Sequence, residues 1–272
     1  MTGFNNGVFQ DLSEISIPVT SLSVNRGYGA FEFFEVIRRK PFYGDRHFAR
    51  FANTLSILKL TTEFQGRLPE LTDTLIGYHQ ADHFYIKLFA LPHTPSANGF
   101  YQAALYIFPT QMPLYDATLY EEGARLVTKN FQRFLPEAKS TNYLAGQYWM
   151  DELTDSRVVD VLYHNGKSVQ ESSRGNLFAV KGGNVITPGK NILKGVTRSL
   201  ALEILEAQQI PHTESELSLD ALFSADEVFL SSTTKHILPI TRIDGSVIGN
   251  GKPGVISQKV MTEFQRLKEQ FT

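Results

Sequence analysis

A lysine, a carboxylate and a glycine-containing turn follow one another in an order that suits carbonyl chemistry. Lys139 lies in the segment 139–143, Lys-Ser-Thr-Asn-Tyr, and Glu171 follows at the end of a predicted strand. A lysine amine forms a Schiff base with a carbonyl carbon when it is partly unprotonated, which a desolvated setting favours. The segment 193–197, Leu-Lys-Gly-Val-Thr, opens a predicted helix, and the free N–H groups of a helix start bind phosphate. Each feature is ordinary alone, because most loop lysines are solvated, strand-end acids are common and every helix has an N-terminus.

Taken together, these groups meet the requirements of one cofactor. An amine for a Schiff base, an acid that keeps a pyridine nitrogen protonated and a helix start for a phosphate are what pyridoxal phosphate needs from a protein. Tyr143 is placed to bond a phenolate oxygen of that cofactor, although an interfacial tyrosine is commoner. The hydroxyl cluster 231–234, Ser-Ser-Thr-Thr, suits either a phosphate cup or a plain turn. His47 and Arg50 share one helical face, which points either to solvent or, through Arg50, to a phosphate.

Length and composition restrict the class of protein. The 272 residues are enough for one large domain or two modest ones, and 42% hydrophobic with 20% charged residues is typical of a globular chain. A net charge of −2 gives no electrostatic argument for nucleic acid or an anionic membrane. The absence of cysteine excludes disulfides, thiol catalysis and sulfur-ligated zinc, and no metal site is expected. The first residues lack a signal-peptide pattern and no stretch suits a membrane span, so a cytoplasmic protein is expected.

The hydrophobic pattern predicts an α/β protein of the α+β type, with a smaller N-terminal lobe and a larger, β-rich C-terminal lobe. Two prolines and the lack of a period around 109–116 mark the boundary. We therefore expect an N-terminal lobe over 1–110, a linker over 111–118 and a C-terminal lobe over 119–272. The first lobe should hold strands at 31–37, 83–91 and 101–108 and helices at 45–60, with Asp45 as N-cap, and 68–79. The second should hold strands at 125–128, 158–163, 168–171, 176–180, 185–187, 227–231 and 237–240, helices at 143–154, 197–208 and from 255, and turns at 165–166 and 182–183.

Ordered motifs run through most of the chain, from about residue 26 to residue 254. They are a glycine-containing strand entry at 26–32, His-Phe-Ala-Arg-Phe at 47–51, Lys-Ser-Thr-Asn-Tyr at 139–143, Glu followed by Asn-Leu-Phe in 171–178, Ile-Thr-Pro at 186–188, Leu-Lys-Gly-Val-Thr-Arg at 193–198 and Ala-Asp-Glu-Val-Phe at 225–229. The series resembles the fold-type-IV pyridoxal-phosphate enzymes, a group of branched-chain aminotransferases, D-amino-acid aminotransferases and aminodeoxychorismate lyases. The resemblance implies a site between two lobes and a homodimer in which the partner subunit completes each pocket.

The resemblance also implies a role for each matching residue. Lys139 is expected to form the Schiff base and to carry the proton between the substrate α-carbon and the cofactor, while Glu171 faces the pyridine nitrogen. Tyr143 is expected at the 3′-oxygen, and Leu193 is expected to pack against the ring. The phosphate is expected to be held by Arg50, Val196, Thr197 and Thr233, and the other expected cofactor-binding residues are Asn176, Gly195 and Ser232. The residues expected to bind substrate are Tyr28, Phe31, Tyr85, Lys87, Arg174 and Thr234.

The substrate side distinguishes the branches of this group. The branched-chain enzymes carry Tyr-x-Arg on a strand where this chain has Tyr85-Ile-Lys87, and lysine keeps the charge but loses the bidentate fork. Phe31 fits the branched-chain pattern at a position where D-amino-acid enzymes tend to have tyrosine. No Arg-x-His stands near 88–91, so the D-amino-acid branch is the least expected. Arg174 replaces a glycine of the branched-chain pattern and either meets a substrate carboxylate or points to solvent.

Three functional hypotheses remain. The first is an aminotransferase that moves an amino group between a branched-chain-like L-amino acid and a 2-oxo acid. The alternative is a 4-amino-4-deoxychorismate lyase that releases pyruvate and 4-aminobenzoate; the chain is close to lyase length, whereas Tyr143 favours transamination because some lyases carry arginine there. The third is a non-enzymatic relative, which the presence of both Lys139 and Glu171 argues against.

Overall fold

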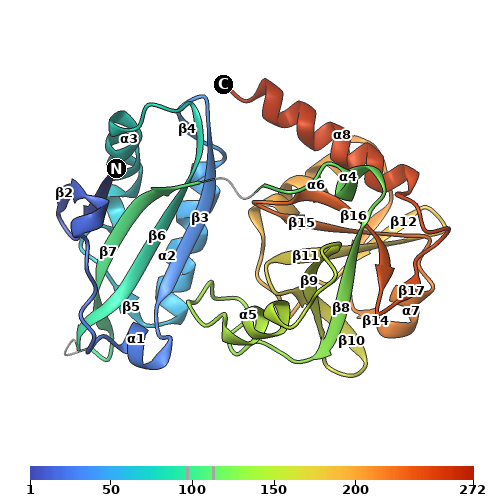
Figure 1. Ribbon diagram of the computed structural model, residues 1–272, viewed down its shortest axis with the longest axis horizontal. Helices are drawn as coiled ribbons and strands as arrows, with labels where there is room; N and C mark the ends of the chain where they lie inside the picture. Colours follow the sequence, from blue (N-terminus) through green and yellow to red (C-terminus); the bar gives the residue numbers. More distant parts are fainter. Residues whose placement is uncertain (96–97, 112–113) are drawn as a thin grey trace. The chain divides into compact units, whose positions relative to one another are not determined.

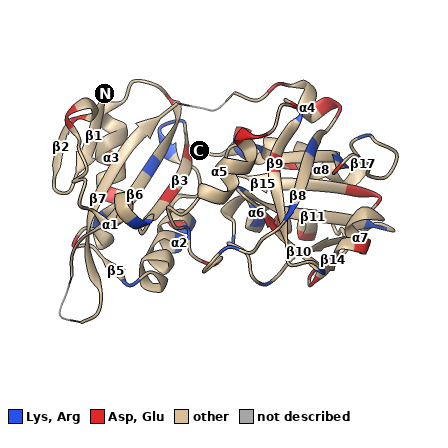
Figure 2. Cartoon of the chain, turned by 60° about the horizontal axis from the view of Figure 1, so that its bottom comes forward, with Lys and Arg blue, Asp and Glu red and all other residues tan. Residues whose placement is uncertain are grey.

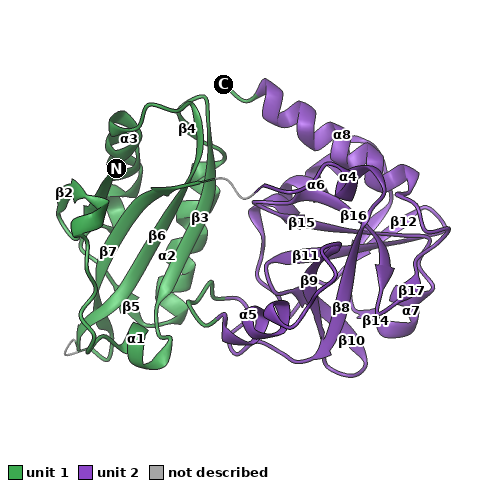
Figure 3. Ribbon diagram, in the orientation of Figure 1, with its two compact units in different colours: residues 1–112, 138–142, 271–272 green, residues 113–137, 143–270 purple. Residues whose placement is uncertain are grey.

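The chain divides into two compact units (Figure 1, Figure 3). The structure is a computed structural model, which describes residues 1–95, 98–111 and 114–272. Unit 1 comprises residues 1–112, 138–142 and 271–272, and unit 2 comprises residues 113–137 and 143–270. The short segment 138–142 therefore belongs to unit 1 although the chain has already entered unit 2 (Figure 3). Residues 112 and 113, within the predicted linker 111–118, lie outside the described residues.

Unit 1 is built on one mostly antiparallel sheet. Its strand order is β2-β1-β7-β6-β3-β4, and β5 pairs in parallel with β7. In register, Phe31 of β3 faces Phe89 of β6, which faces Tyr106 of β7, so the three side chains share one face of the sheet. The strands are β1 (Thr2–Asn5), β2 (Val8–Asp11), β3 (Ala30–Ile37), β4 (Lys40–Pro41), β5 (Leu60–Thr61), β6 (His83–Pro95) and β7 (Tyr101–Thr110).

Helix α2 (Gly44–Ile57) packs along β3 (Figure 1). Phe51 and Leu55 of this helix are buried, and burying such a side chain stabilises the fold by about 1.5–3 kcal/mol. The prediction that Asp45 is the N-cap is wrong, because the helix begins at Gly44 after Tyr43 takes a left-handed backbone conformation with φ 53°. The other helices of unit 1 are α1 (Leu22–Arg26) and α3 (Leu68–Tyr78), with short 3₁₀ turns at Leu12–Glu14 and Gln65–Arg67.

The strand pairings of unit 2 close on themselves. The order runs β13-β12-β11-β15-β16-β8-β9-β10-β14, and β10 also pairs with β11. The strands from β11 round to β10 therefore form a ring, which has no free edge. Leu126, Leu162, Leu177, Leu230 and Leu238 belong to the hydrophobic core cluster that these strands share.

The elements of unit 2 have the following bounds. The strands are β8 (Ala124–Asn130), β9 (Val158–His164), β10 (Ser168–Ser172), β11 (Gly175–Lys181), β12 (Asn184–Thr187), β13 (His212–Glu214), β14 (Leu217–Ser218), β15 (Glu227–Ser232), β16 (His236–Ile243) and β17 (Ser246–Val247). The helices are α4 (Thr118–Glu121), α5 (Leu144–Asp151), α6 (Val196–Ala207), α7 (Leu219–Phe223) and α8 (Val255–Gln270). Helix α8 packs on β15 and β16.

The α/β fold class predicted from the sequence is confirmed, and the elements expected from residue 31 onward are present with shifts at their ends. The sequence interpretation missed the hairpin β1–β2, whose four-residue strands are too short to show a period. It also missed the short elements α1, β4, β5, α4, β13, β14, α7 and β17. Gly166 and Gly183 have φ of 88° and 82°, which explains the glycines at the two predicted turns.

Charge is interspersed over the elements of both units (Figure 2). Acidic and basic residues are scattered among uncharged ones, in keeping with the net charge of −2. In the described part of the chain, no helix combines the length and the apolar composition that crossing a membrane requires.

Candidate active site

Lys139 is bound to the start of strand β3 through its backbone. Its carbonyl accepts a hydrogen bond from the Phe31 N–H at 2.9 Å, and its own N–H donates to Thr54 Oγ1 of α2 at 3.1 Å. Ser140 forms a bridge to Ala30, so the segment 138–142 lies alongside the start of β3. The Lys139 ammonium lies 4.4 Å from the centroid of the Phe31 ring. Most loop lysines are solvated, but Lys139 is half-buried and its backbone is held by hydrogen bonds on both sides.

A buried carboxylate binds Arg50, the predicted phosphate residue of unit 1. Arg50 donates through Nε to Glu32 Oε2 at 2.9 Å and through one terminal nitrogen to Oε1 at 2.6 Å. His47 Nδ1 lies 3.1 Å from the same Oε1. Burial raises the pKa of Glu32, but the charge of Arg50 and the contact with His47 outweigh burial and hold the pKa below its usual range. Burial also lowers the pKa of His47, so the His47–Arg50 face is not a solvent face.

The predicted substrate residues of unit 1 have different surroundings. Lys87 lies beside Phe31, with its ammonium 5.7 Å from the Phe31 ring centroid and 5.2 Å from that of Phe89, and burial lowers the pKa of Lys87. Phe31 is therefore approached by two amines, those of Lys87 and Lys139. Tyr85 instead is fully buried and stacks on Phe33 at 4.9 Å, as a core residue does. The hydroxyl of Tyr28 donates to the Leu58 carbonyl, and burial raises its pKa.

Glu171 is a buried acid in unit 2 and is not the surface acid that strand ends usually carry. Its Oε1 accepts from Arg133 at 2.9 Å, and its Oε2 accepts from the Leu193 N–H at 2.8 Å. The Arg133 guanidinium also lies 5.7 Å from the ring centroid of Tyr143. Burial lowers the pKa of Arg133, but Glu171 and Tyr143 outweigh burial and raise it overall. Glu171 thus joins Arg133 to the backbone of the turn that precedes α6.

Arg133 was missed by the sequence interpretation. It lies in the loop 131–137 between β8 and the Lys139 segment, where no motif or period marks it. Glu171 needs a partner such as Arg133 because it is buried, and a buried carboxylate requires a partner of opposite charge or several hydrogen bonds. That burial could not be read from the local sequence of β10.

The start of α6 has the free backbone N–H groups that the sequence prediction requires there. Gly195 is the N-cap, and no side chain caps the helix, so the first N–H groups are open at Val196 and Thr197. Asn176 donates to the Leu193 carbonyl at 2.9 Å and holds this turn. A Cβ on residue 195 would lie 2.3 Å from Asn176 Oδ1, so only glycine fits there. Asn176 therefore acts as a support for the turn.

In the hydroxyl turn between β15 and β16, two of the hydroxyl groups contact other groups of the protein. Ser232 Oγ accepts from the Lys235 N–H at 3.0 Å, and Thr234 Oγ1 lies 3.4 Å from the hydroxyl of Tyr115. Thr233 is half-buried. The turn lies beside the Asn176 support, because Asn176 and Ser231 are register partners of β11 and β15. Arg174 is exposed and donates to the Val159 carbonyl at 3.4 Å.

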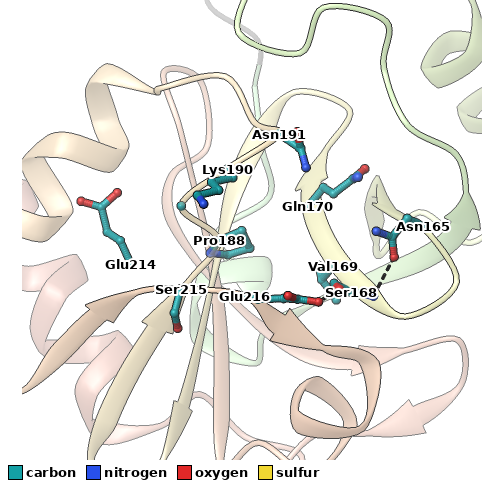
Figure 4. Close-up of a pocket in the computed structure, with 11 residues that line it drawn as sticks. Asn165, Ser168, Val169, Gln170, Pro188, Lys190, Asn191, Glu214, Ser215 and Glu216 are labelled. Carbon is teal, nitrogen blue, oxygen red and sulfur yellow. Dashed lines mark hydrogen bonds between the residues drawn. The ribbon is translucent and has the colours of Figure 1, made fainter.

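A separate hollow of about 480 Å³ lies in unit 2, next to the residue that precedes Glu171 (Figure 4). Gln170, Lys190, Asn191 and Glu216 are among its polar lining residues. None of the predicted cofactor residues lines this hollow. The candidate residues are therefore identified separately in each unit, by the contacts of Lys139 within unit 1 and of Glu171 within unit 2.

Comparison with known proteins identifies the family of the chain. The family model of amino-transferase class IV matches residues 29–243, so the chain belongs to the class IV aminotransferase family. D-alanine aminotransferase of Staphylococcus aureus (strain N315) is 28% identical over 281 residues, covering 98% of this chain and 97% of the relative. The D-alanine aminotransferase of Bacillus licheniformis is 26% identical over 272 residues, with 96% and 94% covered.

Solved structures give the same fold. The branched-chain aminotransferase of Thermoproteus uzoniensis with norvaline is 27% identical, with a TM-score of 0.87 over 98% of this chain and 94% of that one. The branched-chain amino acid aminotransferase from Escherichia coli, 23% identical with a TM-score of 0.84 over 98% of this chain and 93% of that one, shares the fold. The protein is a pyridoxal-phosphate-dependent aminotransferase, and the lyase alternative is not favoured.

Proposed function

We propose that this aminotransferase moves the amino group of an L-amino acid with an apolar, branched-chain-like side chain to a 2-oxo acid. The observation that carries the proposal is the pair of amines around Phe31, with Lys139 at 4.4 Å and Lys87 at 5.7 Å from its ring centroid. The Phe31 ring offers an apolar surface for a substrate side chain, while Lys87 offers a positive charge for a carboxylate. Lys139 supplies the amine.

The residues of both units support the cofactor roles that we propose. Pyridoxal phosphate, when bound, withdraws electrons from the substrate α-carbon. Lys139 would hold and return the α-carbon proton at its Nζ, and Glu171 would keep the ring nitrogen protonated. The open N–H groups of Val196 and Thr197 support a phosphate site at α6. Further cofactor-holding residues in the proposal are Arg50, Tyr143, Asn176, Leu193, Gly195, Ser232 and Thr233, and further substrate residues are Tyr28, Tyr85, Arg174 and Thr234.

The proposal extends to a homodimer that works in the cytoplasm. Leu144 and Tyr148 support a partner surface, because they are one turn apart on α5 and are 78% and 59% exposed. The dimer is also supported by the resemblance to the family. The absence of cysteine is compatible with a reducing compartment.

A D-amino acid is the second candidate substrate. It is favoured by the D-alanine aminotransferases, which match almost the whole chain at 28% identity. Against it stands Phe31, at the position where we expect tyrosine in that branch.

The test of substrate is a half-reaction of the cofactor-loaded protein with L-leucine, L-glutamate and D-alanine separately. We expect L-leucine and L-glutamate to convert the cofactor to pyridoxamine phosphate with release of the matching 2-oxo acid. A response to D-alanine alone would overturn the L-specific proposal in favour of the second candidate. Lys139→Ala should abolish the conversion, whereas Lys190→Ala, which removes an exposed lysine, should leave it unchanged.

A further inference from the structure

A lysine and an aspartate form an ion pair in the interior of unit 2, and neither of them is among the residues assigned above to cofactor or substrate. Lys235 Nζ lies 3.1 Å from Asp160 Oδ2, and both side chains are 0% exposed. Asp160 of β9 is the register partner of Leu126 of β8, a member of the core cluster. Because register partners point to the same face of a sheet, Asp160 points into the ring of strands.

The lysine end of this pair belongs to the hydroxyl turn. Lys235 closes the turn between β15 and β16, and its N–H donates to Ser232 Oγ at 3.0 Å. The hydroxyl of Tyr120 donates to the Lys235 carbonyl at 3.2 Å. The Lys235 ammonium also lies 5.8 Å from the ring centroid of Tyr115. The backbone of the turn is therefore tied to the position of one buried ammonium.

The aspartate end is tied to the turn that follows Glu171. Asp160 Oδ2 accepts from Ser172 Oγ at 3.0 Å, and Ser173 Oγ donates to Oδ1. Ser172 and Ser173 are the first two residues after Glu171, at the end of β10. Asp160 thus fixes the chain directly beside the acid of the site.

Stability alone does not account for these charges. A buried ion pair repays its desolvation cost poorly, and replacing both partners by neutral groups of similar size is often neutral or stabilising. Burial raises the pKa of Asp160, but Lys235 and Arg174 outweigh burial and lower it, so the carboxylate stays ionised. The pair joins the side chains of two turns, the one after Glu171 and the one that contains Ser232, Thr233 and Thr234.

We infer that the Asp160–Lys235 pair is a positioning element that holds the hydroxyl turn at a set distance from Glu171. The inference rests on the proposed function, in which this turn helps to bind the cofactor phosphate and Glu171 faces the ring nitrogen. A rigid cofactor presents its ring nitrogen and its phosphate at a fixed spacing, so the two turns must match that spacing. Neither Asp160 nor Lys235 touches the cofactor in this arrangement.

The test compares the affinities for pyridoxal phosphate and for pyridoxal, which lacks the phosphate. The double variant Asp160→Asn with Lys235→Met removes both charges, while asparagine keeps the shape of the side chain and one oxygen that accepts from Ser172 or Ser173. We expect the preference for the phosphorylated form to fall at least tenfold, with the affinity for pyridoxal and the urea midpoint unchanged. Lys181→Met, at an exposed lysine paired with Asp226, is the matched control and should keep the full preference.

The outcomes separate the inference from the function on which it rests. A folded double variant with the preference of the natural sequence would overturn the inference alone. A natural protein that binds neither compound, or shows no preference for the phosphate, would overturn the proposed cofactor site and the inference with it. If the double variant does not fold, Tyr120→Phe replaces it, because it removes only the hydrogen bond to the Lys235 carbonyl. A lowered preference in that variant supports the inference, and an unchanged one overturns it.

Discussion

Each unit buries one glutamate against an arginine, and the two pairs are built differently. In unit 1 the guanidinium of Arg50 binds both oxygens of Glu32, and His47 shares one of them. In unit 2 Glu171 accepts from Arg133 through Oε1 and from the Leu193 N–H through Oε2. The fork on Glu32 joins β3 to α2 through side chains, whereas Glu171 also binds the backbone of the turn that precedes α6. Burial alone therefore does not identify a functional acid; the contact of Glu171 with that turn sets it apart.

The largest expected effect is on unit 1. Glu32→Gln leaves the Arg50 charge buried without its carboxylate, and breaking a buried pair in this way costs about 3–5 kcal/mol. We expect the free energy of unfolding, measured by urea denaturation, to fall by that amount. A change below about 1 kcal/mol, the size of a surface pair, would show that Glu32 is not the internal support we describe.

Glu171→Gln should separate activity from stability. Glutamine keeps the shape and accepts from the Leu193 N–H, but it loses the charge that a protonated ring nitrogen needs. We expect kcat to fall about 100-fold, the lower end of the range for a lost proton-holding group. The urea midpoint should fall less than that of Glu32→Gln. Equal kcat in the variant and the natural protein would contradict the assignment of Glu171.

Acid should weaken unit 1 through Glu32 and His47 together. The pKa of Glu32 lies below its ordinary value of 4.5, so its stabilisation is complete above that pH and is lost as the pH falls through the folded pKa. The pKa of His47 is also lowered, so the unfolded chain takes up that proton first below its ordinary value of 6.5. Both effects make stability fall with pH. Below about pH 4.5, urea midpoints should fall more steeply for the natural protein than for Glu32→Gln, because the glutamine does not titrate.

The smallest effect is expected at an exposed pair of the same kind. Arg67 binds Glu70 on the surface of unit 1 in a two-pronged geometry like that of Arg50 on Glu32. Glu70→Gln should leave the urea midpoint unchanged within error, because solvent screens the pair. A loss comparable with that of Glu32→Gln would mean that geometry, and not burial, sets the value of such pairs.

Local pattern predicts the elements well and the pairing of charges poorly. The strand at 31–37 could be recognised because aromatic and β-branched residues run together, and Lys139 and Glu171 could be found because their motifs are contiguous. Arg133 and the Asp160–Lys235 pair could not, since each joins segments far apart in the chain. The membership of residues 138–142 in unit 1 has the same origin, because it depends on hydrogen bonds to β3 and α2.

The chain returns to unit 1 at residues 138–142 and again at its C-terminus, and this has a genetic consequence. Unit 1 is assembled from three separate stretches, and its C-terminal stretch packs Phe271 against Phe42 with ring centroids 5.0 Å apart. A gene cut once between the units would leave the first product without Lys139 and without its last aromatic contact. A single crossover therefore cannot exchange the two units as independent modules, because the Lys139 segment of unit 1 is encoded within the coding sequence of unit 2.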